Sequence, residues 1–207
     1  MKPYPSIPPS TGQKFREFEA CVFDKLDGSN LRFEWSRKQR WHKFGTRHRL
    51  FDHTDPDFGV AIPLFLTGWQ EDLTRVAVDN RWDHLIVFME FWGEKSFAGK
   101  HDPADLKKLT LFDACPSKKG LLGPKEFLKL FGHLKTPRFL GIHKWTRGFV
   151  DRIRKGESDL DGITFEGVVG KGGSGHKLVM AKAKTQAWID KVYSQYGDVE
   201  GKKIVDS

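Results

Sequence analysis

A lysine, Lys25, lies between two apolar runs, 20–23 and 31–35, whose composition is typical of β-strands. The residues at 27–30 (Asp-Gly-Ser-Asn) favour a turn, because glycine can take a positive φ and short polar side chains bond to the nearby backbone. We therefore expect Lys25 at the mouth of a sheet. A lysine beside a hairpin is ordinarily a solvated charge, but a deprotonated lysine amine is also a nucleophile, and this position could support that chemistry.

Two glutamates, Glu90 and Glu166, lie in apolar surroundings further along the chain. Glu90 is at the end of the apolar run 84–91, and Glu166 precedes the apolar residues at 168–169. A buried carboxylate is costly unless it has a partner or water, so both residues are candidates for a polar site. Carboxylate oxygens are also ligands that Mg²⁺ accepts.

Two lysines, Lys182 and Lys184, lie in the predicted strand 177–184. Alternate side chains of a strand point to the same side, so we expect the two ammonium groups on one face and the intervening apolar residues on the other. A free lysine has a pKa of about 10.4, and neighbouring cations favour its neutral form. Two ammonium groups on one face could offset charge on a phosphate, and the family resemblance described next implies that they also activate Lys25.

A series of segments resembles, in order, the motifs of the covalent nucleotidyltransferases, the superfamily of ATP-dependent DNA ligases, RNA ligases and mRNA capping enzymes. The segments are Lys25-Leu26-Asp27-Gly28-Ser29-Asn30 (KxDGxN), Gly45-Thr46-Arg47, Glu90 with Gly93 (ExxG), Leu111-Phe112-Asp113, Glu166-Gly167-Val168-Val169 (EGVV) and Lys182-Ala183-Lys184 (KxK). Arg49 is an alternative to Arg47. A single motif of this kind is a weak signal, whereas the ordered series covers most of the chain.

The resemblance implies an ATP-dependent RNA ligase of the RNA ligase 2-like family, with a role in RNA repair. Lys25 would become adenylylated by ATP, AMP would pass to a 5′-phosphate, and a 3′-hydroxyl would displace AMP to seal the strand. The resemblance further implies Lys25, Lys182 and Lys184 as catalytic residues, Glu90 and Glu166 as ligands of Mg²⁺ or Mn²⁺, and Phe112 as the surface on which the base stacks. The nucleotide-binding residues that it implies are Phe23, Asp24, Lys25, Asn30, Arg47, Glu90, Phe112, Glu166, Lys182 and Lys184.

The order of the expected elements favours an α+β fold with largely antiparallel sheets flanked by helices, because strands outnumber helices without strict alternation. By resemblance, this is a single nucleotidyltransferase domain at 11–196 with an ATP pocket between its sheets. We expect an extended arm at 1–10 and a polar tail at 197–207. The expected strands are 20–23, 31–35, 84–91, 109–114, 139–145, 163–170 and 177–184, with a cationic hairpin at 37–49, and the expected helices are 59–80, 124–134, 146–155 and 186–196. The glycine-rich segment 171–176 lacks the residues of a phosphate-binding P-loop and is expected to be a flexible hairpin loop.

The chain has 207 residues and a formal charge of +8, which favours a polyanionic partner such as nucleic acid. It has no apolar run of about 18 residues and no basic-then-apolar leader, so we expect a soluble, cytoplasmic protein without a membrane partner. The sequence leaves open whether the protein is phage-encoded. Both cysteines, Cys21 and Cys115, fall in apolar runs and are expected to be reduced thiols. The histidines lack paired ligand spacing, so we expect no histidine-bound metal.

The segment after Lys184 is too short for the C-terminal OB-fold of DNA ligases and capping enzymes. It is also too short for the helical C-terminal domain of many RNA repair ligases. We therefore expect a minimal ligase, or one whose protein partner supplies the missing substrate-binding domain. The alternatives are a DNA nick ligase, a nucleic-acid end-binding protein that retains the pocket without turnover, and GTP transfer as in capping.

Overall fold

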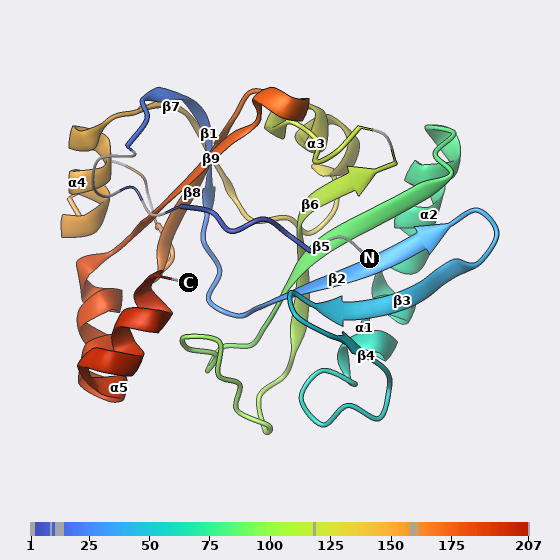
Figure 1. Cartoon of the computed structure of the whole chain (residues 1–207), viewed down its shortest axis with the longest axis horizontal. Helices are drawn as coiled ribbons and strands as arrows, with labels where there is room; N and C mark the ends of the chain where they lie inside the picture. Colours follow the sequence, from blue (N-terminus) through green and yellow to red (C-terminus); the bar gives the residue numbers. More distant parts are fainter. Residues whose placement is uncertain are drawn as a thin grey trace. The chain divides into compact units, whose positions relative to one another are not determined.

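The computed structural model describes residues 3–8, 10, 15–117, 119–157, 160 and 162–206. Within these residues, nine β-strands form two antiparallel sheets, accompanied by five α-helices (Figure 1). The predicted α+β fold with antiparallel sheets is confirmed. The chain divides into two compact units: the N-terminal segment through Pro5 with Asp27–Thr136, and Ser6–Leu26 with Pro137–Ser207. Each unit has its own sheet and its own apolar cluster.

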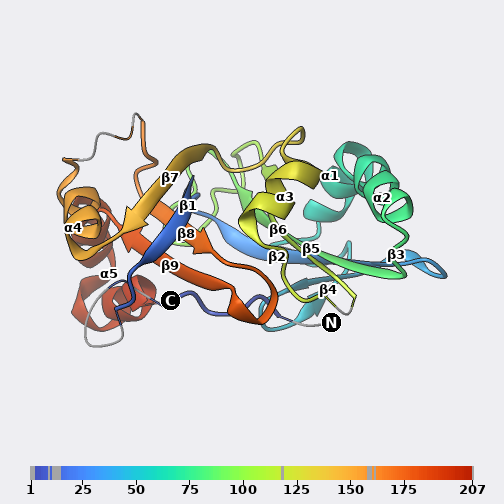
Figure 2. The same cartoon turned by 90° about the horizontal axis from the view of Figure 1, so that it is seen from above.

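The first unit contains a five-stranded sheet in the order β4-β3-β2-β5-β6. Its strands are β2 (Ser29–Ser36), β3 (Arg40–Thr46), β4 (Leu50–Phe51), β5 (His84–Trp92) and β6 (Lys108–Pro116). Its helices are α1 (Ala61–Gly68), α2 (Gln70–Asp79) and α3 (Pro124–Phe131), and they lie on one side of the sheet (Figure 2). We call the side of this sheet opposite the three helices the open face.

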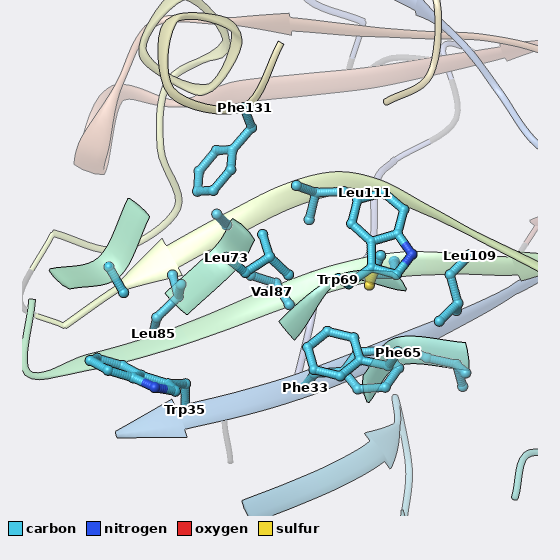
Figure 3. Packing of buried hydrophobic residues seen from close by; sticks show 14 of the residues in the cluster. Phe33, Trp35, Phe65, Trp69, Leu73, Leu85, Val87, Leu109, Leu111 and Phe131 are labelled. Atoms are coloured by element: carbon cyan, nitrogen blue, oxygen red, sulfur yellow. The ribbon is translucent and has the colours of Figure 1, made fainter. Parts of the chain in front are cut away.

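Alternation along the strands builds the core beneath these helices. In β5, Leu85, Val87, Met89 and Phe91 point toward the helices and are fully buried. Phe33 of β2 stacks on Phe65 of α1 with ring centroids 4.2 Å apart (Figure 3). Such close aromatic packing stabilises the sheet against the helices.

The predicted helix 59–80 is wrong in one respect, because the structure has two helices that meet at Trp69. Trp69 leaves helical geometry, with φ −138° and ψ −33°. Its indole is buried in the core, together with Leu73 and Ala77 of α2 (Figure 3). The break therefore lets α1 and α2 turn their separate apolar faces onto the same sheet, which a single straight helix would not do.

The second unit contains a four-stranded antiparallel sheet in the order β7-β1-β8-β9. Its strands are β1 (Phe18–Asp24), β7 (Phe139–Trp145), β8 (Gly167–Gly172) and β9 (Val179–Lys184), and its α-helices are α4 (Arg147–Lys155) and α5 (Gln186–Asp206). A short 3₁₀ turn at Gly175–Lys177 lies in the connection between β8 and β9. The expected hairpin loop at 171–176 thus begins two residues later, because β8 extends through Gly172.

Helix α4 covers one face of this sheet. The Thr146 side chain caps its N-terminus by accepting a hydrogen bond from the Phe149 N–H, and Gly156 ends it with φ 72°. Its buried residues, Phe149, Val150 and Ile153, form a cluster with apolar side chains of the strands. The other sheet face is therefore the one left for polar chemistry.

The predicted polar tail at 197–207 is also wrong, because α5 continues through Asp206. Gly197, with φ 70° and ψ 178°, kinks the chain without ending it. Beyond the kink, Gly201 is buried and faces the Tyr193 ring so closely that a side chain at position 201 would clash. The second half of the helix is thus held by packing rather than by its own helix propensity. None of the described helices combines the length and the apolar character that crossing a membrane requires.

A buried carboxylate, Glu34 of β2, leads to a prediction about acid stability. Its Oε1 lies 3.1 Å from His84 Nε2, 3.3 Å from Lys43 Nζ and 3.6 Å from His42 Nε2. Burial alone would raise the pKa of Glu34, but hydrogen bonds and positive charge from His84 and Lys43 lower it below its ordinary value of 4.5. A lowered folded pKa stabilises the protein above pH 4.5, and this stabilisation is lost as pH falls through the folded value.

We expect Glu34→Gln to lower the free energy of unfolding at pH 7 by about 1.5–3 kcal/mol, the range for hydrogen bonds to charged groups. The deficit should shrink as pH falls from 5 toward 3, where the wild-type carboxylate becomes neutral as well. Urea unfolding at each pH measures both effects. Glu71→Gln is the control, because its 3.2 Å pair with Arg75 is exposed on α2 and should contribute less than about 0.5 kcal/mol. A pH-independent deficit in Glu34→Gln would contradict the prediction.

Candidate active site

Lys25 is fixed by backbone hydrogen bonds at the end of the second unit's sheet. Its N–H donates to the Gly167 carbonyl at 2.9 Å, which extends the pairing of β1 with β8 past Asp24. The Thr164 hydroxyl donates to the carbonyls of both Lys25 and Gly167. On the other side of β8, the Thr185 N–H donates to the Glu166 carbonyl at 3.0 Å. Three adjacent strand ends therefore place Lys25, Glu166 and Lys184 at one end of the sheet.

The side chains of these three residues meet. Lys25 Nζ lies 2.7 Å from Glu166 Oε1, and Lys184 Nζ lies 3.5 Å from the same oxygen. Side-chain exposure is 5% for Glu166 and 7% for Lys184, whereas Lys25 retains 22% and is open to a ligand. The Glu166 carboxylate therefore lies between the two amines, within ion-pair distance of both.

Lys184 and Lys182 share the sheet face opposite α4. Ala181 and Ala183, which alternate with them, pack with the α4 cluster, so the predicted alternation is observed. Lys184 Nζ also donates to the Ile204 carbonyl at 3.1 Å and lies 4.2 Å from the centre of the Trp188 ring. Both lysines are buried. Buried ammonium groups are costly unless an anion or a dipole compensates them, so this face is prepared for negative charge.

A third buried lysine on the same face, Lys171, is absent from the sequence-based site. It lies in β8 opposite Cys21 and Met180, and its Nζ is 5.7 Å from the centre of the Phe23 ring. Lys171 was predicted to lie in the glycine-rich connector, whereas it belongs to β8 and is only 7% exposed. Side chains alternate between the two faces of a strand, so continuing the strand from Val169 to Lys171 would have predicted both residues on the same face.

Asp24, predicted as a nucleotide-binding residue, has a different neighbourhood. Its carboxylate accepts from Arg138 Nε at 3.1 Å and is 8% exposed. The Thr164 N–H also donates to this carboxylate, at 3.4 Å. These contacts tie β1 to the segments that flank β7 and β8, which is a positioning function for the residue next to Lys25.

The first unit holds the remaining predicted residues. Asn30 of β2 pairs in register with Glu90 of β5, and Glu90 is partly exposed. Arg47 follows β3, and its Nε is buried with no hydrogen-bond partner among the described residues. Arg49, the alternative, forms an ion pair with Asp55 and lies 5.9 Å from the centre of the Phe58 ring. Arg49 thus already has an ion-pair partner, whereas the buried Nε of Arg47 has no hydrogen-bond partner among the described residues.

A β-bulge in β6 determines where Phe112 and Asp113 point. Asp113 pairs with Phe88 and Leu111 with Met89, which leaves Phe112 as the extra residue. Leu111 and Ala114 both belong to the core although they are three residues apart, so the two residues between them lie away from the core. A bulge re-aims side chains in this way. The open face thereby receives both members of the predicted Phe-Asp element.

The described residues contain no group of three or more His, Cys, Asp or Glu side chains that could hold a metal ion by themselves. The second unit offers Glu166 and the first unit offers Glu90. Mg²⁺ is commonly bound by one or two carboxylates together with water and substrate phosphates. Each unit therefore offers one candidate carboxylate ligand.

A cleft of about 530 Å³ in the first unit contains none of the predicted site residues. It is lined by residues of α1, of the start of α2, of the β5 and β6 ends, and of the segment after α3. Two of its lysines are already paired, Lys107 with Asp105 and Lys108 with Glu94. Its charge is therefore largely balanced, and its lining gives no reason to place the chemistry there.

No protein-family model matches the chain, and no curated protein matches it by sequence. An archaeal ATP-dependent RNA ligase matches in structure, with a TM-score of 0.66 and 17% identity over 99% of this chain and 56% of its own. A mutant RNA ligase from Naegleria gruberi, solved with ATP and Mn, has a TM-score of 0.61 and 18% identity over 84% of this chain and 51% of its own. The chain thus spans about half the length of these proteins. It has the fold of the nucleotidyltransferase domain of RNA ligases.

Proposed function

We propose that the chain is an ATP-dependent RNA ligase in which Lys25 forms a covalent bond to AMP. The observation that carries the proposal is the cluster of Lys25 Nζ, Glu166 Oε1 and Lys184 Nζ at the end of one sheet. These residues come from distant parts of the sequence, and the partly exposed Lys25 and the buried Lys184 share one carboxylate oxygen. The fold of the RNA ligase neighbours supports the same proposal.

In the first step, the Lys25 amine attacks the α-phosphorus of ATP. A nitrogen–phosphorus bond forms, the bond to the bridging oxygen of pyrophosphate breaks, and the amine loses a proton. Glu166 Oε1, 2.7 Å from Lys25 Nζ, is within reach to accept that proton. The ammonium groups of Lys182 and Lys184 offset the charge that builds on the α-phosphate, which is how such transfers are mainly catalysed.

The following steps use the same groups in turn. An oxygen of a 5′-phosphate attacks the lysyl-bound phosphorus, the nitrogen–phosphorus bond breaks, and Lys25 regains a proton. A 3′-hydroxyl then attacks the 5′-phosphate and expels AMP, which seals the strand. Buried cations on the β8 and β9 face would stabilise the negative charge in each step.

The first unit would bind the nucleotide. Phe112 offers a ring for the adenine base. The Arg47 guanidinium suits a phosphate, and the Glu90 carboxylate suits a ribose hydroxyl. Asn30, beside Glu90 in the sheet, would hold the turn that follows Lys25. Phe23 and Asp24 would act from β1, as an apolar wall and as an anchor to Arg138 respectively.

By the family resemblance, Glu166 and Glu90 are each a candidate ligand of a Mg²⁺ or Mn²⁺ ion that would enter with the phosphate oxygens of ATP. When bound, the ion neutralises charge on the departing pyrophosphate.

The net charge of +8 supports a nucleic-acid substrate. The proposed reaction requires that this substrate have a 5′-phosphate and a 3′-hydroxyl end. Contacts to 2′-hydroxyl groups would decide between RNA and DNA. Sealing of matched RNA and DNA nicks, compared at one salt concentration, separates an RNA ligase from a DNA nick ligase.

The experiment that tests the proposal is incubation with each of the four labelled nucleoside triphosphates and Mg²⁺ or Mn²⁺. We expect an acid-stable, amine-linked AMP adduct from ATP, which peptide mass spectrometry places on Lys25. Absence of any adduct, or an adduct on another lysine, would contradict the proposal. A GMP adduct would instead indicate capping chemistry.

A further inference from the structure

Tyr4, in the N-terminal segment of the first unit, is buried, although the sequence favours an extended arm at these residues. Its side chain is only 4% exposed. The ring contacts Phe88 and Phe112, with centroids 5.0 Å from each. Neither phenylalanine belongs to the core cluster beneath the helices, so Tyr4 packs on the open face of the sheet. Figure 2 shows the N-terminal segment on the side opposite α1, α2 and α3.

The Tyr4 hydroxyl is anchored to the second residue of the β6 bulge. It donates to Asp113 Oδ2 at 2.9 Å, and the Ala114 N–H donates to Asp113 Oδ1 at 3.0 Å. Both oxygens of this buried carboxylate thus accept hydrogen bonds from groups of the protein, the Tyr4 hydroxyl and the Ala114 N–H. Asp113 of the predicted Phe-Asp element therefore holds the Tyr4 hydroxyl by a hydrogen bond, whereas Phe112 beside it remains partly exposed.

The electrostatic surroundings connect Tyr4 with two other predicted residues. Burial raises the pKa of Tyr4 well above 10.0, and the Asp113 and Glu90 charges raise it further, whereas the Arg47 charge lowers it. The hydroxyl therefore stays protonated and acts as a donor throughout the physiological range. Tyr4 lies among Arg47, Glu90, Phe112 and Asp113, all on the open face of the first unit.

We propose that Tyr4 is a positioning residue of the nucleotide site, which holds the Phe112 ring in the orientation needed to stack on the base. The inference deepens the proposed function and rests on it. The Tyr4 and Phe112 rings meet nearly perpendicular, at 87°, so Tyr4 covers at most one face of Phe112. A bulge residue has an unpaired backbone, and a neighbour that fixes its side chain reduces the entropy lost when a ligand binds.

The sequence around Tyr4 suits this role. Tyr4 lies between Pro3 and Pro5, whose fixed φ angles stiffen the segment. A stiff segment loses little conformational freedom when it docks, so one ring and one hydrogen bond are enough to hold it. The alternative role, in which Tyr4 fills the place of the base and must be displaced, predicts the opposite effect on affinity.

The test measures ATP affinity by calorimetry with Mg²⁺ in a Lys25→Ala background, where bound ATP is not consumed. We expect Tyr4→Ala to raise the Kd for ATP about tenfold and Tyr4→Phe about threefold, the latter because only the anchor to Asp113 is lost. Tyr193→Phe, which removes a hydroxyl from α5 in the second unit, is the matched control and should leave the Kd unchanged. Thermal unfolding of each variant reports whether the folded state is retained.

A double-mutant cycle with Phe112→Ala separates positioning from general stability. If Tyr4 acts through Phe112, then Tyr4→Ala changes the Kd less than twofold once Phe112 is gone. An unchanged or lower Kd in Tyr4→Ala, or fully additive effects with Phe112→Ala, would overturn the inference. The same outcomes leave the proposed function standing as long as the Lys25→Ala parent binds ATP. A parent that does not bind ATP refutes both.

Discussion

Lys25→Ala is expected to abolish the AMP adduct, with a loss of more than about 10,000-fold in the rate of adenylylation. The reason is that alanine has no nitrogen to attack the α-phosphorus. Lys184, which shares the Glu166 oxygen, is 7% exposed and already bound to Glu166 and the Ile204 carbonyl, so we do not expect it to replace Lys25. The measurement is transfer of label from ATP to protein after acid quenching.

Two controls distinguish a missing nucleophile from a misfolded chain. Lys155→Ala removes an exposed lysine from the last turn of α4 and should form the adduct at the wild-type rate. A nick whose 5′-phosphate already carries AMP bypasses the first two steps, so Lys25→Ala should still seal it within about tenfold of wild type. Adduct formation by Lys25→Ala would refute the assignment of the nucleophile.

Gly167→Ala is expected to lower the free energy of unfolding by about 3 kcal/mol or more, because it combines backbone strain with a clash. Gly167 has φ 132°, and a Cβ there would lie 2.1 Å from the Ala183 carbonyl oxygen. That oxygen belongs to β9 and cannot move without opening the pairing of β8 with β9. The Gly167 carbonyl also accepts from the Lys25 N–H, so the adduct should be lost with the pairing.

Gly148→Ala is the matched control for this substitution. Gly148 lies in the first turn of α4, and a Cβ there would meet nothing within 4 Å. Alanine should therefore raise stability by about 0.4–1 kcal/mol, since it restricts the unfolded chain. Urea unfolding measures both variants. Equal stability of Gly167→Ala and wild type would show that position 167 accepts a side chain, contrary to the structure.

Much of the fold could be predicted because its signals are local. Alternating or continuous apolar runs indicated the strands β1, β2, β5, β6 and β7 within a few residues, since side chains of a strand take opposite sides in turn. The same alternation placed Lys182 and Lys184 on one face. The helix propensity of 186–196 indicated the start of α5, but not its continuation past Gly197, which depends on packing against Tyr193.

The candidate site is predictable only in part, because its contacts join strands that are distant in the sequence. Residue types and order identify Lys25, Glu166 and Lys184 as partners through the family resemblance, and the ladder between β1, β8 and β9 brings them within hydrogen-bond distance. Lys171 was missed because glycines on both sides made it look like a loop residue. Its burial depends on neighbouring strands distant in sequence.

The sequence by itself determined which residues could do chemistry. It also determined which side chains of one strand lie on the same face, because side chains alternate between the two faces of any extended chain. The tertiary structure decided the register between strands. The bulge that turns Phe112 and Asp113 to the same side, and the docking of Tyr4 onto them, depend on pairing with β5 and on residues more than 100 positions away. No local pattern encodes such a contact, because it exists only once the strands have paired.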